Sequence, residues 1–529
     1  MLQGESVFAR VSALLFALCA CLGHARVSRA NPQLPATLSA DAAPSAPTPT
    51  PDPTSATPTP IAPVLVAPTD VAPPPVEPPP STPKPAATTP DVTPRPPPPP
   101  GFDGKQAIDD SDYQRKTEGG YFTGLPLANY DSNTGLGLGV RGYYYYNGHR
   151  SDPLFAYTPY LSRIFLQAFV TTEGLQFHWF DIDMPSIVGT PFRFRSQLIF
   201  QRNIGQHYFG LGSRAMAPLS FTGSPSTYRK FADYQAALDR VNDAGQTHSQ
   251  YDNYRLTQPM LLLSIERTVL NGLVRPLVGL GFTYNRIGDY TGESVDATDP
   301  SGKATSAQMA PTRLNEDCQA GIIVGCSGGW NNFFRLGVSL DTRDYEPDPN
   351  RGVFVDAALD LGSRVLGSHY EWARAMLSPR VYIDPFRHWV DLVFAGRATF
   401  QVQSKDSPFF GMNFLPYTED PRTGLGGLRT LRGYKQDRFV GPVMTLVNAE
   451  VRWTFLQFEV ASQKFALIAV PNMDLGATFD RVSQIRLNDW RRSQGAALRI
   501  SWNLATIVTT EYAFSDEDSA FYVNFNHMF

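Results

Sequence analysis

Residues Thr445–Phe455, which read TLVNAEVRWTF, alternate between apolar and polar side chains. A period of two places the apolar side chains on one face of a β-strand and the polar side chains on the other. The polar face carries Asn448, Glu450 and Arg452, whereas residues 447, 449, 451, 453 and 455 on the opposite face are all apolar. The stretch therefore predicts a strand that separates two different environments.

The same alternation recurs along the chain after residue 135. It is clear in residues 333–343, FFRLGVSLDTR, and in the last residues, 521–529, FYVNFNHMF. Many of these segments exceed the ~5–6 residues typical of strands in soluble sheets, and their length suits a tilted crossing of a bilayer. Short connections, such as 172–174, 270–272 and 384–388, alternate with long ones, such as 287–330 and 403–440.

These features predict an all-β fold, a closed transmembrane antiparallel β-barrel of about 16 strands. Closure is required because an open sheet edge in lipid would leave backbone groups without partners. We expect the first strand at residues 136–146 and one short strand near 207–215. Girdles of aromatic side chains at the membrane interfaces would explain residues 143–146, Trp372, Trp389, Trp453 and Trp502.

The N-terminal part of the chain has a different composition. Residues 1–30 contain a purely small and apolar stretch that is too short to anchor, as in a secretory signal peptide. Cys21 could be the acylated residue of a poor lipoprotein signal or part of a discarded peptide, and the sequence leaves both open. More than half of the 46 prolines lie in residues 31–100, which contain no aromatic residue, so residues 31–118 are predicted to be a disordered Pro/Ala/Thr-rich linker before a barrel at 119–529.

Several segments, in order, resemble the outer-membrane assembly-factor superfamily, the BamA/TamA-like proteins whose barrel is also called the bacterial surface antigen domain. They are Pro126–Asp131 with Thr134–Gly139, Tyr208–Gly212, Asp341–Asp344 with Pro349 and Gly352, and Gly426–Tyr434 followed by Asn448, Glu450 and Arg452. The resemblance covers residues 119–529. It implies a protein that takes part in inserting, assembling or translocating proteins at the bacterial outer membrane.

The resemblance also implies a functional loop. In this family the sixth extracellular loop folds into the lumen, and the Arg of its Arg-Gly-aromatic tip pairs with an Asp on the inner wall. The matching residues here are Arg432, Gly433 and Tyr434, with Asp480 as the expected carboxylate partner. A guanidinium in a partly dehydrated lumen needs such a partner, and Gly permits a tight turn beside it. Val482 stands where the family usually has Gly, which is a departure from its pattern.

A second implied site is the seam between the first and last strands, which in this family is weakly sealed. We expect the seam strands to contain Gly135, Gly137 and Gly139 on one side and Phe525 and Phe529 on the other. Glycine lowers strand stability, so an opening seam could pair with an incoming strand. The C-terminal pattern ending at Phe529 also resembles the signal by which the barrel assembly machinery inserts barrels.

No motif for catalysis or cofactor binding emerges from the sequence. Gly137, Gly139 and Gly142 match a dinucleotide fingerprint, but they open a strand rather than a helix, so we expect no cofactor. The histidines are scattered along the sequence and indicate neither a set of catalytic residues nor a metal site. We therefore expect that the protein is not an enzyme. Cys318 and Cys326, in a long loop of an exported protein, are predicted to form a disulfide.

Two functions remain open at this point. Residues 31–118 show no pattern of the periplasmic docking modules that assembly factors usually carry, so this chain resembles a barrel-only member. It could act on unfolded outer-membrane or secreted client polypeptides, with outer-membrane lipids around it and the Pro-rich arm in the periplasm. Alternatively, it could be a passive channel or a surface-structural barrel. A net charge of −4 excludes a strongly basic surface for nucleic acids.

Overall fold

The computed structural model describes residues 96–99, 102, 104–105, 107–108, 110–131, 135–187, 189–418, 422–460, 463–525 and 527–529. The predicted signal peptide, Cys21 and residues 31–95 of the predicted linker lie outside the described residues. The chain divides into residues 1–94 and residues 95–529, and the description below concerns the second unit.

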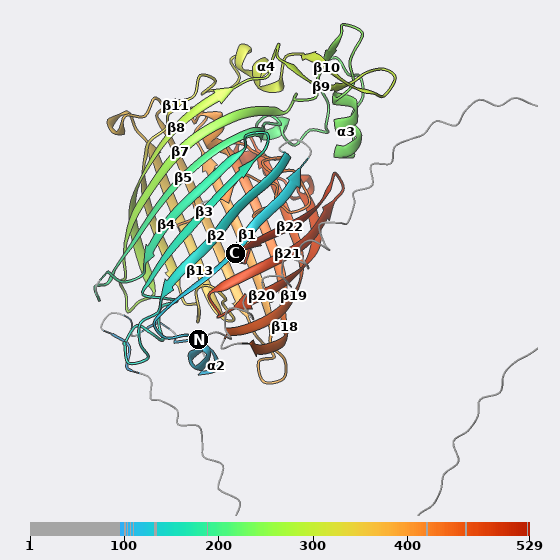
Figure 1. Ribbon diagram of the computed structural model, residues 1–529. Coiled ribbons are helices and arrows are strands. Elements are labelled where there is room, and N and C mark those ends of the chain that lie inside the picture. Colours follow the sequence, from blue (N-terminus) through green and yellow to red (C-terminus); the bar gives the residue numbers. More distant parts are fainter. Residues whose placement is uncertain are drawn as a thin grey trace, which may run out of the picture. The chain divides into compact units, whose positions relative to one another are not determined.

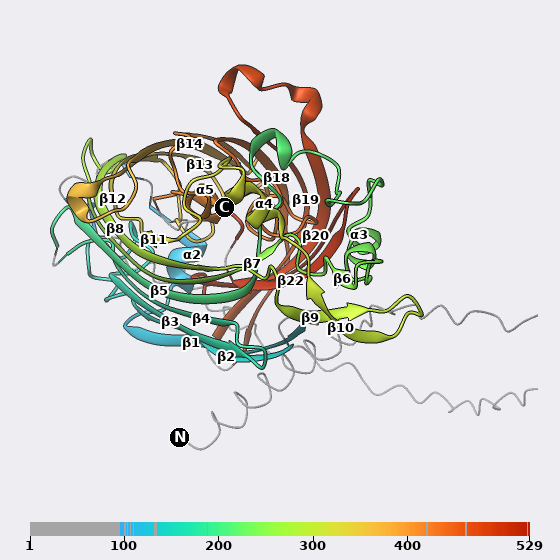
Figure 2. The same ribbon diagram turned by 90° about the horizontal axis from the view of Figure 1, so that it is seen from above.

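One antiparallel sheet of 17 strands curls into a barrel (Figures 1 and 2). One of these strands, β11 (Gly329–Trp330), has two residues, which leaves sixteen full strands and confirms the predicted all-β barrel. The sixteen are β1 (Gly120–Asp131), β2 (Gly135–Tyr146), β3 (Ser162–Thr171), β4 (Gln176–Met184), β5 (Phe192–His207), β7 (Asn253–Arg267), β8 (Val274–Gly288), β12 (Phe333–Asp341), β13 (Gly352–Gly362), β14 (Trp372–Ile383), β15 (Leu392–Gln403), β18 (Val443–Val460), β19 (Gln463–Phe479), β20 (Arg491–Trp502), β21 (Thr506–Ser515) and β22 (Ser519–Phe525).

The predicted alternation decides which side chains face the lumen. On β18, Asn448, Glu450 and Arg452 are buried inside, whereas Trp453 is exposed outside. On β12, Arg335 and Asp341 are buried and the intervening apolar side chains are exposed. The apolar outer surface suits lipid, and charged side chains pair with one another within the lumen, as Arg335 does with Asp360 and Arg452 with Glu450.

The two ends of the barrel differ in their connections. Long connections at one end carry α3 (Phe231–Leu238), α4 (Arg313–Gln319) and a small sheet of β6 (Gln246–Thr247), β9 (Ser294–Thr298) and β10 (Ala304–Met309). α3, α4, β9 and β10 are labelled at the top of Figure 1. The predicted disulfide is present there, between Cys318 and Cys326. We call this the extracellular end and the opposite one the periplasmic end, following the usual layout of outer-membrane barrels.

Three details of the fold differ from the sequence predictions. The sixteenth strand is β1, because residues 207–215 contain only the end of β5 and a short 3-10 helix, Gly212–Arg214. The short turn 172–175 lies at the extracellular end, and the long connection 147–161 lies at the periplasmic end. Trp372 and Trp502 are buried, so they do not belong to an interfacial girdle.

The helices of the described residues are short. None of them is long and apolar enough to cross a membrane. The helix α2 (Asp110–Arg115) lies at the periplasmic end (Figure 1).

Candidate functional site: a lumenal loop beside the seam

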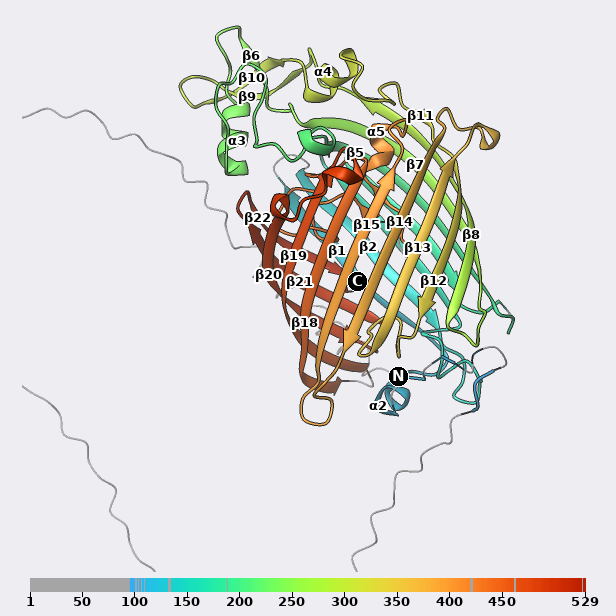
Figure 3. The same cartoon turned by 180° about the vertical axis from the view of Figure 1, so that it is seen from behind.

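The connection between β15 and β18, described at residues 404–418 and 422–442, lies inside the barrel. It contains α5 (Phe409–Met412), β16 (Phe414–Leu415) and β17 (Arg422–Thr423); α5 lies at the extracellular ends of the strands in Figure 3 and within their ring in Figure 2. Its apolar side chains form a core with residues of the barrel wall. The loop members are Leu415, Tyr417, Leu425, Leu431, Tyr434 and Phe439, and the wall members are Ala358, Met376, Met444 and Leu446. This packing holds the loop against β13, β14 and β18.

Arg432, at the tip of this lumenal loop, is fully buried among carboxylates. Its Nε and Nη2 donate to the two carboxylate oxygens of Asp474 over 2.7 and 2.6 Å. Its Nη1 donates to Glu450 at 3.0 Å and to Glu511 at 2.6 Å. The guanidinium therefore contacts β18, β19 and β21 at once.

The surrounding charges are balanced. Arg452 and Arg499 also donate to Glu450, so three guanidinium groups meet three carboxylates, those of Glu450, Asp474 and Glu511. Burial alone would lower the pKa of the Arg432 guanidinium, but Asp474 and the other carboxylates outweigh it and raise that pKa well above its ordinary value. Arg432 thus stays charged inside the lumen.

Gly433 and Tyr434 extend the contact toward the last strands. Gly433 has φ of 75°, and a Cβ there would lie 2.8 Å from the backbone carbonyl carbon of Phe514. Its N–H donates to the hydroxyl of Tyr522 at 3.1 Å, and the Tyr434 hydroxyl donates to Asp516 at 2.6 Å. Only glycine fits this close, left-handed position.

The predicted partner of Arg432 is wrong. Asp480 accepts from the N–H and the hydroxyl of Ser213, at 3.2 and 2.5 Å, so it joins the β5–β7 connection to the extracellular end of β19. Asp474 and Asp480 are an even number of residues apart, so the alternation of a strand places both on the same face. The separation of six residues between these positions nevertheless corresponds to about 20 Å along the strand. The pairing register of β18 with β19 indicates Asp474 as the partner of Arg432. In this register Asp474 lies opposite Asn448, and Glu450 is the next residue of β18 on the same face.

The seam strands also differ from the prediction. Gly135, Gly137 and Gly139 belong to β2, which pairs with β1 on one side and β3 on the other, so the first seam strand is β1. Its sequence, GYFTGLPLANYD, has a proline in the middle, which obscured the strand pattern and is tolerated at a sheet edge.

The seam itself is held by side chains. Among the described residues, β1 pairs only with β2 and β22 only with β21, with no backbone ladder between β1 and β22. Because β22 ends opposite Val508, β1 meets β21 at the periplasmic end, where the hydroxyls of Thr123 and Thr506 are 2.7 Å apart. Tyr145 packs beside them and donates to the carbonyl of Ala505.

The C-terminal residues leave the sheet and enter the lumen. Phe525 is the last residue of β22, as expected for a seam strand. Phe529, however, is buried against Tyr382, Val393 and Ala395 on the opposite wall, so its assignment to the seam is wrong. His527 would face lipid if the strand continued, and instead it contacts Asp348 and Arg499 at 2.6 Å each.

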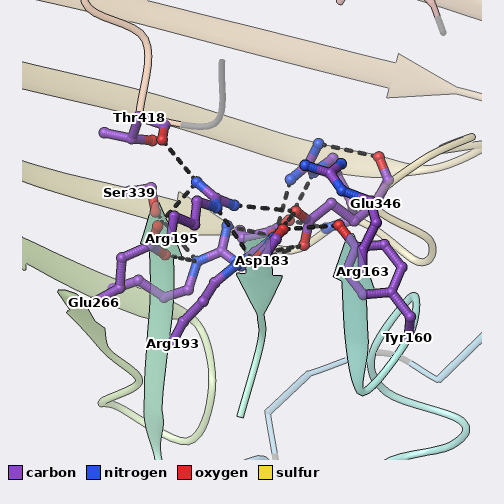
Figure 4. A network of polar contacts seen from close by, with 12 residues as sticks. Tyr160, Arg163, Asp183, Arg193, Arg195, Glu266, Ser339, Glu346 and Thr418 are labelled. Carbon is purple, nitrogen blue, oxygen red and sulfur yellow. Dashed lines mark hydrogen bonds and ion pairs between the residues drawn. The ribbon is translucent and has the colours of Figure 1, made fainter. Parts of the chain in front are cut away.

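A second network of charges lies in the periplasmic half of the lumen, and Figure 4 shows its contacts. Glu346, from the connection between β12 and β13, pairs with Arg193 at 2.8 Å and Arg195 at 3.4 Å. Asp183 of β4 binds both arginines as well. Burial alone would raise the pKa of the Glu346 carboxyl, but Arg193 and Arg275 hold it well below its usual range. This connection thus folds inward across the periplasmic mouth.

Residues 102–118, as far as described, form a strap across the same mouth. Gly104 N–H donates to the carbonyl of Asn271, and Ile108 N–H to that of Ala156. The Lys116 ammonium group is buried and donates to the carbonyls of Phe155 and Thr158 at 2.6 and 2.7 Å. The predicted linker therefore extends too far at its C-terminal end, because the described residues of this part pack on the barrel.

Comparisons with known proteins agree with this architecture. Residues 196–529 match the Omp85 superfamily domain, and residues 99–161 match a domain of unknown function, DUF5982. Among curated proteins, no match is found. Residues 99–161 comprise the strap, β1, β2 and the connection that the strap contacts.

Three solved structures match this chain at low identity. BamA from Haemophilus ducreyi lacking POTRA domains 1–3 is 11% identical, with a TM-score of 0.41, and the alignment covers 78% of this chain and 69% of that one. CdiB from Escherichia coli is 11% identical, with a TM-score of 0.42 and coverages of 77% and 61%. CdiB from Acinetobacter baumannii is 10% identical, with a TM-score of 0.35 and coverages of 78% and 66%.

Proposed function

Because the chain belongs to the Omp85 superfamily and its barrel lies in the bacterial outer membrane, we propose that it inserts or translocates client polypeptides there through the seam between β1 and β22. The observation that carries this proposal is the seam: the described residues of β1 and β22 form no backbone ladder with each other, and the hydroxyl contact between Thr123 and Thr506 joins β1 to β21 instead. An edge strand with unpaired backbone groups can template another strand. The clients would be unfolded outer-membrane or secreted polypeptides.

The lumenal loop supports the same function. Its tip forms hydrogen bonds with β18, β19, β21 and β22 through Arg432 and Gly433. These contacts hold the last strands in place from the lumenal side, although the seam itself has few contacts. A loop held in this way fixes the final strands when β1 moves away. The Pro-rich arm would extend into the periplasm, and the barrel assembly machinery would insert the chain itself.

The alternative function is a passive channel. The docked loop and the two networks of charges argue against a channel, because they place side chains in both the extracellular and the periplasmic half of the lumen. Deleting the gene and quantifying other outer-membrane proteins separates the two functions. We expect selected outer-membrane proteins to fall in abundance, and complementation with the full chain should restore them. Unchanged levels, together with planar-bilayer conductance that rises in Arg432→Ala, would identify a channel instead.

A further inference from the structure

A cavity lies in the extracellular half of the lumen, between the wall formed by β2 to β5 and the lumenal loop. Its volume is about 420 Å³, within the range of roughly 300–1,000 Å³ that is common for small-molecule sites. Leu175 and Gln176 line it at the turn between β3 and β4, so it reaches the extracellular end of the barrel. Gly426 and Gly427 of the lumenal loop line the opposite side.

The lining combines amides, aromatic rings and arginines. Its amide side chains belong to Gln167, Gln176, Gln201, Asn203 and Gln436. Phe177 and Trp179 provide two aromatic rings, and Arg141 and Arg429 provide two guanidinium groups. No described residue of the lining is an Asp or a Glu. This composition differs from the apolar lining typical of small-molecule sites.

Two polar groups of the lining have no hydrogen-bond partner among the described residues. Gln167 on β3 is 8% exposed, and its amide makes no hydrogen bond with them. The indole N–H of Trp179 on β4 is also buried without an acceptor. Buried polar groups are almost always paired in folded proteins, so the unpaired indole N–H of Trp179 beside this cavity indicates a polar ligand.

We propose that this cavity binds an acidic saccharide. A sugar hydroxyl both donates and accepts hydrogen bonds, as an amide does, so the amides can pair with several hydroxyls at once. The C–H face of a sugar ring is apolar and fits against the rings of Phe177 and Trp179. A carboxylate or sulfate on the sugar would accept hydrogen bonds from Arg141 and Arg429, in addition to the contacts of Arg141 with the Phe165 ring and of Arg429 with the carbonyl of His527.

The lining argues against a lipid acyl chain as the occupant. An acyl chain would cover the amide of Gln167 and the indole N–H of Trp179 without giving either a hydrogen-bond partner, which is unfavourable. Free phosphate would use the arginines but neither aromatic ring. The saccharide is the chemistry that uses all three kinds of side chain in the lining.

Isothermal titration calorimetry on the full chain in detergent tests the proposal. The probes are trigalacturonate and N-acetylglucosamine 6-sulfate, with neutral maltotriose for comparison. We expect at least one acidic probe to bind at least tenfold more tightly than maltotriose, with an affinity that falls as salt rises. Gln167→Leu and Trp179→Leu should each weaken binding at least tenfold. Arg141→Gln should reduce the preference for the acidic probe.

Trp389→Phe is the matched control, because Trp389 lies in the periplasmic turn between β14 and β15 and is 88% exposed. Its affinity for the acidic probe should equal that of the unmodified chain. An unchanged difference in gel mobility between heated and unheated samples shows that each variant is folded. Absence of binding by both acidic probes, or equal affinity in Gln167→Leu and Trp389→Phe, would overturn the proposal.

Discussion

The backbone N–H of Gly433 donates a 3.1 Å hydrogen bond to the hydroxyl of Tyr522. This contact joins the tip of the lumenal loop to the last strand of the barrel, 89 residues further along the chain. Since Ser515 also donates to the Gly433 carbonyl, at 2.7 Å, the tip is attached on both sides to the strands that form one edge of the seam. The loop therefore positions these strands as well as filling the lumen.

Removing the charge of Arg432 should destabilise the barrel. Arg432→Ala would leave Glu450, Asp474 and Glu511 buried with one cation fewer, and breaking a buried ion pair typically costs about 3–5 kcal/mol. We expect a lower urea midpoint for unfolding in detergent. Arg364→Ala, which removes an exposed ion pair with Glu371, should change the midpoint little. Equal midpoints for the two variants would contradict the described role of Arg432.

Asp474→Asn and Asp480→Asn should have different effects. Asp474 accepts two hydrogen bonds from the Arg432 guanidinium and one from its backbone N–H, whereas Asp480 binds Ser213 at the exposed end of the barrel. We expect rapid cleavage of the lumenal loop by added protease in Asp474→Asn and unchanged cleavage in Asp480→Asn. Faster cleavage in Asp480→Asn than in Asp474→Asn would indicate that Asp480, and not Asp474, is the partner of Arg432.

The substitution Gly433→Ala tests the close approach of the loop tip to β21. The added Cβ would meet the Phe514 backbone at 2.8–2.9 Å, in addition to the strain of a positive φ. Gly223→Ala is the matched control, because Gly223 has φ of 87° and no atom near a Cβ. Thermal unfolding should therefore shift to a markedly lower temperature in Gly433→Ala than in Gly223→Ala. Similar shifts would show that the tip is not packed as described.

Docking of the N-terminal strap should depend on pH through Lys116. Burial lowers the pKa of this amine from 10.5 to about 7 in the docked strap. Between these two values the undocked strap binds more protons, so docking becomes more favourable as the pH rises from 7 to 10. A spin label attached after Asp110→Cys should become less mobile over this range. The added change Lys116→Met should remove the pH dependence, and its persistence would exclude Lys116 as the cause.

Alternation along the strands predicted much of the fold and part of the site. Residues 445–455 revealed the lumenal and lipid-facing sides, because hydrocarbon and water select opposite side chains. Alternation gives parity but not depth, so it could not distinguish Asp474 from Asp480. It also cannot show where a strand stops. His527 and Phe529 share the parity of lipid-facing residues, yet Asp348, Arg499 and the opposite wall draw them into the lumen.

The role of the seam is tested most directly by closing it. The hydroxyls of Thr123 and Thr506 are 2.7 Å apart, so the double variant Thr123→Cys/Thr506→Cys should form a disulfide between β1 and β21. The control Ser378→Cys/Thr399→Cys replaces a similar hydroxyl pair, 2.9 Å apart, between β14 and β15.

The measurement is the insertion of an unfolded barrel protein into liposomes that contain each oxidised variant. We predict that the seam disulfide abolishes insertion, that reductant restores it, and that the control disulfide has no effect. Full insertion with the seam disulfide intact would contradict the account.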